Sequence, residues 1–401
     1  MGDRLEEQGP QRACPVCDSI ARDRLFRQRF ATIEGASVCR GYDVVLCAKC
    51  SFGFADRGPS QRELDDYYER ASKYEHEIRG GAPSPGDVER FAVVAREVAA
   101  VLPKGGRVVE IGCSTGGLLE LLRGRHGFER VSGIDPSPAC RRAARALYDL
   151  EVVTGTLGAV REAGPFDGII LQQVLEHVVD LEGAIKALAA GLAPGGYLFI
   201  EVPDVSRFAE ERDPPFQQFS VEHMNYFSYE SLANLLARHG FRETYGYPNE
   251  STRANAGVFG AFQLAEGPPA LRPDPTTGPS LRSYVEGCER SEALLHQRLA
   301  TLLSGGRPLY VWGAGTLTLR LLETSALGGA PIRGFVDSNP RYRGKSIRGV
   351  PILSPDQLQP GETPILISTL GAAKAITRQL AQDLRLPNPV WPLYESAPLA
   401  G

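Results

Sequence analysis

A short stretch around residue 112 constrains the fold of this chain more than any other part of the sequence. The sequence predicts a short buried strand from Val108 to Ile111, a glycine-rich loop follows, and Leu118 to Leu122 begin an apolar run with helical character. Strand, tight loop and helix in this order start a parallel α/β sheet, which binds ligands at the carboxyl ends of its strands. The sequence therefore predicts a nucleotide-type ligand site in the loop.

The residues of this loop discriminate between ligands. A dinucleotide loop has the pattern Gly-x-Gly-x-x-Gly, but Gly112, Ser114 and Gly117 occupy these places, so the glycine that admits a pyrophosphate is missing. Glu110 also places negative charge where the phosphates of a dinucleotide would pass. The pattern Glu-x-Gly-x-x-x-Gly, which ends at Gly116, instead resembles motif I of class I methyltransferases. This resemblance implies S-adenosylmethionine, whose sulfonium and amino groups tolerate a carboxylate.

A second strand with an acid at its tip follows the loop. Residues 131–135 form this strand, and the Asp135 carboxylate stands about where such folds bind ribose hydroxyls. The alternative is that the glycines only turn the chain and Asp135 caps the helix that begins near Pro136. The candidate cofactor-binding residues are Glu110, Gly112, Ser114, Gly116, Asp135, Pro136 and Gln173.

Strand and helix patterns alternate from Val88 onward, which predicts a parallel sheet covered on both faces. We expect helices at 88–102 and 141–147, strands at 108–111, 131–135, 152–155, 166–172 and 195–203, and an edge hairpin strand at 257–262. The first and fourth strands of a doubly wound sheet adjoin, so His177 is expected in the same crevice as the glycine loop. The alternative is that His177 has a purely structural role and forms a hydrogen bond at the start of a helix.

A second histidine lies in the segment 216–228, after the fifth strand. Ser228 suits the N-cap of the helix that follows. Glu222 and His223 have no such structural explanation. A histidine on a loop at the carboxyl edge of the sheet can deprotonate a substrate near neutral pH, and an adjacent carboxylate can orient it. We therefore expect His223 to be catalytic.

Two Cys-x-x-Cys pairs, Cys14 with Cys17 and Cys47 with Cys50, precede the sheet. Four thiolates can bind Zn²⁺ tetrahedrally. A small segment with little apolar content needs such a metal cross-link in order to fold. Residues 26–45 must then form an inserted hairpin or loop. A closed set of four thiolates leaves no position for a substrate, so the site is predicted to be structural. A redox pair or four unrelated thiols are the alternatives.

Aromatic residues bridge the cysteine module and the sheet. Tyr67, Tyr68 and Tyr74 are expected mainly to pack on the sheet, and otherwise to cover a substrate. Glycines and prolines at 80–86 then mark a flexible junction.

The final third repeats the strand and glycine pattern. After a Pro-rich linker at 267–275, we expect an amphipathic helix at 281–303 and strands at 309–312, 333–337 and 365–369. The first of these strands enters a Gly313-Ala314-Gly315 turn, and the second ends in Asp337. An NAD(P) site is a minor alternative, because Thr318 occupies the place of the third glycine.

Composition excludes several classes of partner. The 44 basic and 48 acidic residues give a formal charge of -4, so no broad cationic field attracts nucleic acid or anionic lipid. The charged start at 1–7 is unlike a secretory signal, and no apolar run approaches a membrane span. We expect a cytoplasmic protein, monomeric or homodimeric, without nucleic-acid or membrane partners.

The order of these modules resembles the sugar C-methyltransferase family over nearly the whole chain. The residues that carry the resemblance are Cys14, Cys17, Cys47, Cys50, the loop 110–116, Glu222-His223, Gly313-Ala314-Gly315 and Asp337-Ser338-Asn339-Pro340. It implies an α/β protein with a class I methyltransferase Rossmann-like domain at 81–266. A small zinc-binding module with the aromatic bridge at 1–80 and a second Rossmann-like domain at 267–401 would flank it.

The resemblance also implies cofactors, substrate and roles. The cofactors are S-adenosylmethionine and Zn²⁺, and the substrate is a nucleotide-linked keto-deoxysugar of antibiotic or surface-glycan biosynthesis. His223 is the base, Glu222 assists it, and Tyr74 and His177 approach the sugar. The C-terminal domain helps to hold the nucleotide-sugar.

One departure from the family leaves alternatives open. The family often has Tyr-His-Glu-His, whereas Ser220 and Val221 precede the Glu-His pair here, so a tyrosine expected to face the sugar is absent. Methylation of oxygen or nitrogen on a sugar or natural-product precursor therefore remains open. A noncatalytic sugar-binding protein and an NAD-dependent enzyme are more distant alternatives.

Overall fold

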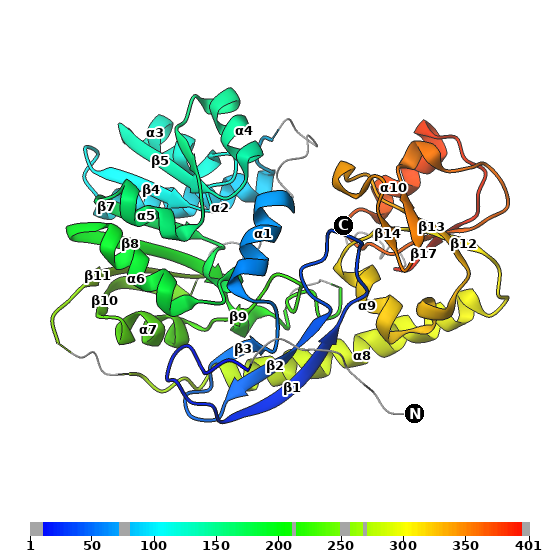
Figure 1. Ribbon diagram of the computed structural model, residues 1–401, viewed down its shortest axis with the longest axis horizontal. Helices are drawn as coiled ribbons and strands as arrows, with labels where there is room; N and C mark the ends of the chain where they lie inside the picture. Colours follow the sequence, from blue (N-terminus) through cyan, green and yellow to red (C-terminus); the bar gives the residue numbers. More distant parts are fainter. Residues whose placement is uncertain (1–10, 72–80, 211–213, 249–256, 268–270, 395–401) are drawn as a thin grey trace, which may run out of the picture. The chain divides into compact units, whose positions relative to one another are not determined.

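The computed structural model divides into two compact units, each assembled from separated segments of the chain (Figure 1). It describes residues 11–71, 81–210, 214–248, 257–267 and 271–394. Unit 1 comprises residues 1–25, 44–209 and 222–282, and unit 2 comprises 26–43, 210–221 and 283–401. This division differs from the three consecutive domains expected at 1–80, 81–266 and 267–401, because two internal segments cluster with the C-terminal part.

Unit 1 contains a seven-stranded sheet in the order β10-β11-β8-β7-β4-β5-β6. Strands β4 to β8 are parallel, and β11 is antiparallel to both β8 and β10. This strand order is that of the class I methyltransferase fold and confirms the predicted fold class. The pairing of β4 with β7 confirms the expected switch point. The strands are β4 (Arg107–Ile111), β5 (Arg130–Asp135), β6 (Val152–Thr154), β7 (Phe166–Gln172), β8 (Leu192–Pro203), β10 (Phe241–Pro248) and β11 (Gly257–Leu264).

Strand β11 is internal, so the prediction that 257–262 form the edge of this sheet was wrong. Among the described strands, β10 occupies the edge of the sheet and pairs with β11. Val258, Phe259 and Ala261 are buried, as expected for an internal strand. The polar residues of β10, including Arg242 and Glu243, suit a half-exposed edge strand.

Alternating apolar residues bury both faces of this sheet. In β7, Ile170 packs with residues of α2 and α3, whereas Ile169 and Leu171 pack with residues of α6 and α7. Ser228 caps α7 as predicted, because its side chain accepts a hydrogen bond from the Ser231 amide. The helices of unit 1 are α1 (Gln61–Ala71), α2 (Pro85–Val101), α3 (Gly117–His126), α4 (Pro138–Tyr148), α5 (Val160–Ala163), α6 (Leu181–Gly191) and α7 (Tyr229–Arg238).

A small sheet has the order β1-β2-β3-β9. Its strands are β1 (Arg22–Arg29), β2 (Gly41–Cys47), β3 (Gly53–Asp56) and β9 (Asn225–Tyr226). The hairpin expected at 26–45 is present as β1 and β2. In unit 1, β9 pairs antiparallel with β3, with Asn225 opposite Phe54, so the chain just beyond His223 joins the N-terminal module.

Unit 2 contains a second, mostly parallel sheet in the order β14-β15-β13-β12-β16-β17, as the repeated nucleotide-fold pattern predicted. At the tip of β13, Asp337 accepts hydrogen bonds from the amides of Ala314, at 2.9 Å, and Asn339, at 2.8 Å. The elements are β12 (Leu309–Trp312), β13 (Ile332–Val336), β14 (Ser346–Ile347), β15 (Val350–Leu353), β16 (Ile365–Ile367), β17 (Val390–Pro392), α9 (Thr316–Thr324) and α10 (Ala373–Arg378). Helix α8 (Thr277–Leu303) begins in unit 1 and continues into unit 2.

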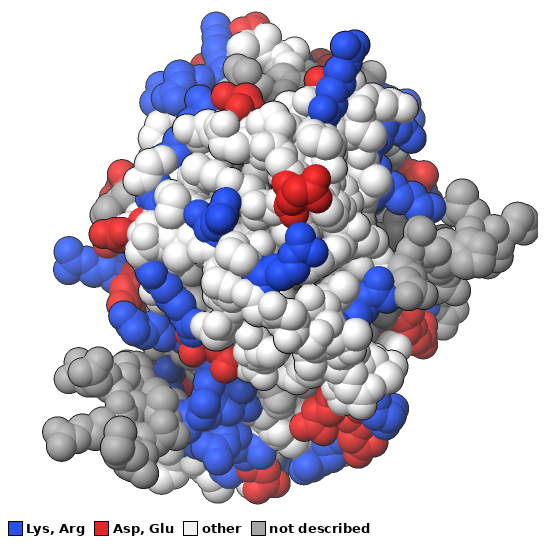
Figure 2. Space-filling model, turned by 90° about the vertical axis from the view of Figure 1, so that its right-hand side faces the viewer, with Lys and Arg blue, Asp and Glu red and all other residues white. Residues whose placement is uncertain are grey.

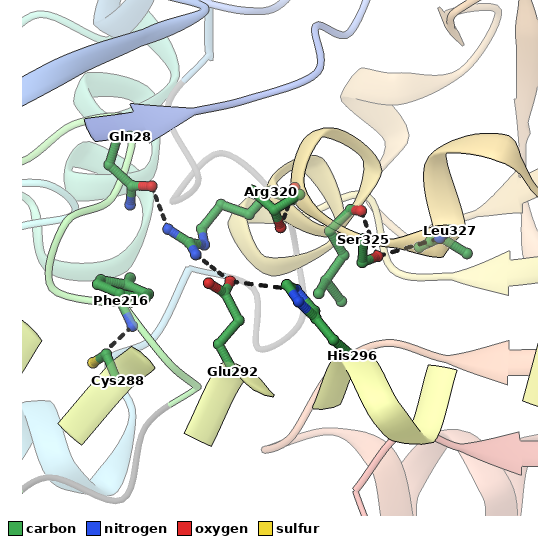
Figure 3. Close-up of polar contacts among 10 residues, drawn as sticks. Gln28, Phe216, Cys288, Glu292, His296, Arg320, Ser325 and Leu327 are labelled. Atoms are coloured by element: carbon green, nitrogen blue, oxygen red, sulfur yellow. Dashed lines mark hydrogen bonds and ion pairs between the residues drawn. The ribbon is translucent and has the colours of Figure 1, made fainter. Parts of the chain in front are cut away.

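A fully buried arginine joins the three segments of unit 2 (Figure 3). Arg320 of α9 donates hydrogen bonds to Gln28 and Glu292, and its guanidinium carbon lies 4.3 Å from the centre of the Phe216 ring. Gln28 in turn donates to the Phe219 carbonyl at 2.5 Å. A buried guanidinium is tolerated only when it is paired and hydrogen-bonded, so these contacts explain why the three segments cluster.

Basic and acidic side chains are interspersed on the face of the molecule that Figure 2 shows, in agreement with the small net charge. Within the described ranges, no helix has both the length and the apolar character needed to cross a membrane.

The strand that carries Asp135 is sensitive to side-chain volume. A Cβ atom at Gly133 would lie 2.4 Å from the Cys113 sulfur, so we expect Gly133→Ala to lower the free energy of unfolding. Such overpacking costs about 1–3 kcal/mol. The loss should be smaller in a Cys113→Ala background, measured by urea denaturation of the two single variants and the double variant. An equal loss in both backgrounds would exclude the sulfur as the cause.

Candidate active site

A cavity of about 240 Å³ lies at the carboxyl ends of β4, β5 and β7 in unit 1. Residues from α1, from the start of α2 and from the loops after these strands line it. Of the predicted cofactor-binding residues, the lining includes Glu110, Gly112, Ser114, Asp135, Pro136 and Gln173. Gly116 is not part of the lining.

The glycines of the loop between β4 and α3 are required by its backbone. Gly112 has φ of +71° and Gly116 has φ of +85°, in the left-handed region that favours glycine. A Cβ atom would lie 2.7 Å from Val174 Cγ2 at the first position and 2.6 Å from Leu150 Cδ1 at the second. Gly116 therefore acts by shaping the turn into α3 rather than by lining the cavity.

Asp135 joins the loops after β4 and β5. Its Oδ2 accepts a hydrogen bond from the Ser114 amide at 2.9 Å, and its Oδ1 accepts one from the Ser137 amide at 2.9 Å. Ser137, and not Asp135, caps α4, because its hydroxyl accepts from the amides of Ala139 and Cys140. The structure thus disfavours the helix-cap alternative for Asp135, and ribose binding stays a prediction.

Glu110 is a buried carboxylate in the wall of the cavity. It is 4% exposed, and its Oε2 has no hydrogen-bond partner among the residues that the structure describes. Burial, and secondarily the Asp135 carboxylate, raise the pKa of Glu110 to about 8, while Arg90 acts in the opposite direction. A ligand with a cationic or hydrogen-bond-donating group here would satisfy the oxygen and favour its ionised form.

His177 lies in the cavity wall, in a single 3₁₀ turn (Leu175–His177) after β7. Its Nδ1 is 3.0 Å from the Glu222 carbonyl oxygen and 3.0 Å from the Tyr68 hydroxyl. A carbonyl oxygen only accepts hydrogen bonds, so we assign the proton of the neutral ring to Nδ1. The lone pair is then on Nε2, which lies 3.6 Å from a carboxylate oxygen of Glu176.

Two tyrosines of α1 bind the Glu222 carboxylate. The hydroxyl of Tyr67 donates to Oε1 at 2.8 Å, and that of Tyr68 donates to Oε2 at 3.3 Å. Both were expected mainly to pack and otherwise to cover a substrate, and their hydrogen bonds to Glu222 were not predicted. No sequence signal pairs them with Glu222, which is more than 150 positions away. Tyr74, which was predicted to approach the sugar, lies outside the described residues.

His223 contacts His177 but is not part of the cavity lining. The two ring centres are 5.0 Å apart in an edge-to-face arrangement. The segments that carry them are joined directly, because the Met224 amide donates to the Glu176 carbonyl at 2.6 Å. The structure therefore brings the predicted residues His177, Glu222 and His223 together, and their catalytic roles stay predictions.

The four paired cysteines form a compact sulfur cluster. The sulfur atoms of Cys14, Cys17, Cys47 and Cys50 all lie within 4.8 Å of one another, and all four residues are free of disulfides. The distance is 3.5 Å between the sulfurs of Cys14 and Cys50 and 3.4 Å between those of Cys17 and Cys47. Such a cluster offers the donor set of a structural zinc site.

Comparisons with known proteins agree with this fold. A family model described as a methyltransferase domain matches residues 87–244. The chain is 29% identical over 276 residues to the C-methyltransferase NovU of Streptomyces niveus, a match that covers 64% of each protein. It is 38% identical over 110 residues to a ubiquinone biosynthesis O-methyltransferase of Xanthomonas axonopodis pv. citri (strain 306), covering 25% of this chain and 45% of that protein.

Among solved structures, the chain is similar to the N-methyltransferase NodS from Bradyrhizobium japonicum WM9 in complex with S-adenosyl-L-homocysteine. The identity is 20% and the TM-score is 0.38, with 51% of this chain and 98% of that chain covered.

The pKa of Glu110 predicts a pH-dependent stability. Its value of about 8 lies above the ordinary 4.5, so the folded chain binds this proton more tightly than the unfolded chain. The resulting stabilisation is present below about pH 4.5 and is lost as the pH rises through about 8. We expect Glu110→Gln to reduce the fall in the free energy of unfolding over this range, measured by urea denaturation at several pH values.

The exposed Glu129→Gln serves as the control, because it removes one carboxylate from the surface of the same domain. It should leave the pH dependence of the wild type unchanged. An equally steep fall in the Glu110→Gln variant would contradict the assignment.

Proposed function

We propose that this chain, whose residues 87–244 form a methyltransferase domain with the class I fold, methylates carbon beside the ketone of a nucleotide-linked keto-deoxysugar. The observation that carries the proposal is the contact between two imidazoles, His177 and His223, beside the cavity at the glycine loop. An imidazole can take the proton that must leave carbon before it accepts a methyl group.

The extent of similarity favours carbon over oxygen as the methyl acceptor. The match to the O-methyltransferase covers 25% of the chain, whereas the match to the C-methyltransferase covers 64%. The shorter match spans fewer residues than the methyltransferase domain itself. The longer match therefore includes features beyond the region shared by different methyltransferases, and the named acceptor of that relative supports our choice.

The cavity fits a methyl donor with cationic groups. S-adenosylmethionine, when bound, supplies an electrophilic methyl group on a sulfonium. Glu110 would balance the positive charges of the donor once it ionises, and Asp135 would receive the ribose hydroxyls. The observation that supports this fit is the Glu110 oxygen in the cavity wall, which has no hydrogen-bond partner within the described part of the chain.

In the proposed reaction, His223 takes the proton from the carbon beside the ketone, and the electron pair of the broken C–H bond moves into the enolate. The enolate carbon would then form a bond to the donor's methyl group in line, as the bond between that methyl group and the sulfur breaks and its electron pair leaves with the sulfur. His177 stabilises the enolate oxygen when its Nε2 carries a proton, and Glu176 at 3.6 Å stabilises the resulting imidazolium. Alignment of the reactants can supply about 7 kcal/mol or more, so positioning outweighs the proton transfer.

His177 is a second candidate for the base. It lines the cavity, and its assigned tautomer leaves the lone pair on Nε2. A buried carboxylate beside that nitrogen would stabilise the charge gained on protonation. The two histidines must therefore be tested separately.

Hydrogen exchange distinguishes His223 from His177 as the base. It also distinguishes carbon from oxygen or nitrogen as the methyl acceptor. In deuterium oxide without methyl donor, the wild type should exchange the proton beside the ketone in a panel of nucleotide-linked keto-deoxysugars, followed by NMR. His223→Gln should slow this exchange by about 10²–10⁴-fold. Binding of S-adenosylhomocysteine, measured by calorimetry, should remain, since the residue is not part of the cavity lining.

If His223→Gln exchanged the proton at the normal rate and His177→Gln did not exchange it, His177 would be the base. Methyl transfer by the wild type without any exchange would contradict carbon methylation and favour the oxygen or nitrogen alternative.

We also propose that Cys14, Cys17, Cys47 and Cys50 bind one structural Zn²⁺, because their sulfurs are close enough for tetrahedral coordination. Cys47→Ser should lower the zinc content and the melting temperature, since binding of a structural ion stabilises the fold. Cys39→Ser is the matched control, because Cys39 lies outside the cluster. Full zinc content in Cys47→Ser, measured by mass spectrometry of metals, would contradict the assignment.

A further inference from the structure

One guanidinium contacts both segments that carry the site histidines. Nη2 of Arg12 donates to the Val179 carbonyl at 2.8 Å, and Nη1 donates to the Met224 carbonyl at 3.2 Å. Nη2 also donates to the Asn225 side-chain oxygen at 3.2 Å. All of these residues belong to unit 1. Arg12 therefore bridges two loops that are separated by more than 40 positions in the chain.

The contacted carbonyls stand close to the two imidazoles along the chain. Met224 directly follows His223, and Val179 is two residues beyond His177. A displacement of either carbonyl would move the adjoining histidine relative to its partner ring. The edge-to-face contact of the rings, with centres 5.0 Å apart, thus depends on the spacing of the two loops.

Arg12 is itself held in place by the N-terminal module. Its amide donates to Asp56 Oδ1 at 2.7 Å, and Arg22 donates both to the Arg12 carbonyl, at 2.6 Å, and to Asp56 Oδ2, at 2.9 Å. A further hydrogen bond runs from Arg12 Nη1 to the Ala55 carbonyl at 3.0 Å. The N-terminal module thus holds Arg12 through its backbone and through Nη1, and the same guanidinium binds the two loops.

The shape of the guanidinium matters as much as its charge. The Arg12 guanidinium carries a positive charge near neutral pH, as arginine side chains in proteins do. Its planar fork presents five donors in fixed directions, whereas a lysine ammonium presents three donors from one point. A lysine here would keep the charge but would not span the Val179 and Met224 carbonyls.

We propose that Arg12 is a positioning residue that holds His177 and His223 in contact by binding the backbone of both loops. Its effect on turnover rests on the proposed function, whereas its effect on the geometry of the two rings does not.

The chain offers a matched control in Arg107. This arginine also donates to two backbone carbonyls, those of Pro165, at 3.1 Å, and Ala163, at 2.8 Å. It also lies over an aromatic ring, 4.5 Å from the centre of Phe166, as Arg12 lies 5.5 Å from that of Phe54. Arg107 does not line the cavity. Its replacement therefore tests the loss of a comparable structural arginine.

The experiment compares Arg12→Lys, Arg12→Met and Arg107→Lys in the full chain, with histidine rings labelled for NMR. The six histidines of the chain allow His177 and His223 to be assigned by single replacements. In the wild type, the two rings should show a nuclear Overhauser contact without any substrate. We expect both Arg12 variants to lose this contact and Arg107→Lys to keep it, with S-adenosylhomocysteine binding retained in all three.

Turnover provides the second readout. Displacement of a reacting group by about 1 Å can cost about 100-fold in rate, so we expect a comparable loss of kcat in Arg12→Lys. Retention of the ring contact in Arg12→Lys, or its equal loss in Arg107→Lys, would overturn the proposal. Loss of the ring contact in Arg12→Lys, combined with full turnover of His223→Gln, would instead support the positioning role and contradict the proposed base.

Discussion

The hydrogen bonds that join residues 222–225 to residues 175–179 are the constraint on which the site depends. Asn225 is buried, and its side-chain amide donates to the carbonyls of Leu175, at 2.8 Å, and Val178, at 2.6 Å. Neither segment contains a long helix or strand that would fix its backbone. Loss of a buried hydrogen-bonding group costs about 1–3 kcal/mol, so replacement of Asn225 should lower the free energy of unfolding by this amount. The joined loops bring the two histidines together beside the cavity.

In the reaction that we propose, binding of the methyl donor and removal of the proton take place at different strand ends of one sheet. The carboxylates of Glu110 and Asp135 stand at the tips of β4 and β5, where a cationic donor would be favoured. The imidazoles and Glu222 stand beyond β7 and β8, where a proton would be removed. The tyrosines of α1 bind the Glu222 carboxylate, so the N-terminal part of the chain completes the acceptor side.

The features that were predicted correctly are local in the sequence. The glycines at 112 and 116 indicate a backbone conformation that requires glycine, and Ser228 indicates the start of a helix. Continuous apolar runs indicate strands that are buried on both faces. The strand order expected of a doubly wound sheet also predicted the approach of His177 to the glycine loop, because that order fixes which strand ends adjoin. These signals were sufficient for the class I fold and for the position of its cavity.

The features that were missed depend on contacts between distant positions. Strand β10 takes the sheet edge that β11 was expected to hold, since a hairpin can insert either of its strands next to β8. Arg320 contacts residues that are far apart in the sequence, in three segments of the chain. The sequence therefore did not show which segments make up unit 2. The bonds from Tyr67 to Glu222 and from Arg12 to Met224 likewise join residues with no shared pattern.

The bond formed by the transferred methyl group tests the central claim most directly. A keto-deoxysugar that the enzyme accepts should be incubated with S-adenosylmethionine labelled with carbon-13 in its methyl group, and the product examined by two-dimensional NMR. If an imidazole beside the cavity creates a carbon nucleophile, the label will be bonded to the sugar carbon next to the ketone. A label bonded to oxygen or nitrogen would contradict carbon methylation.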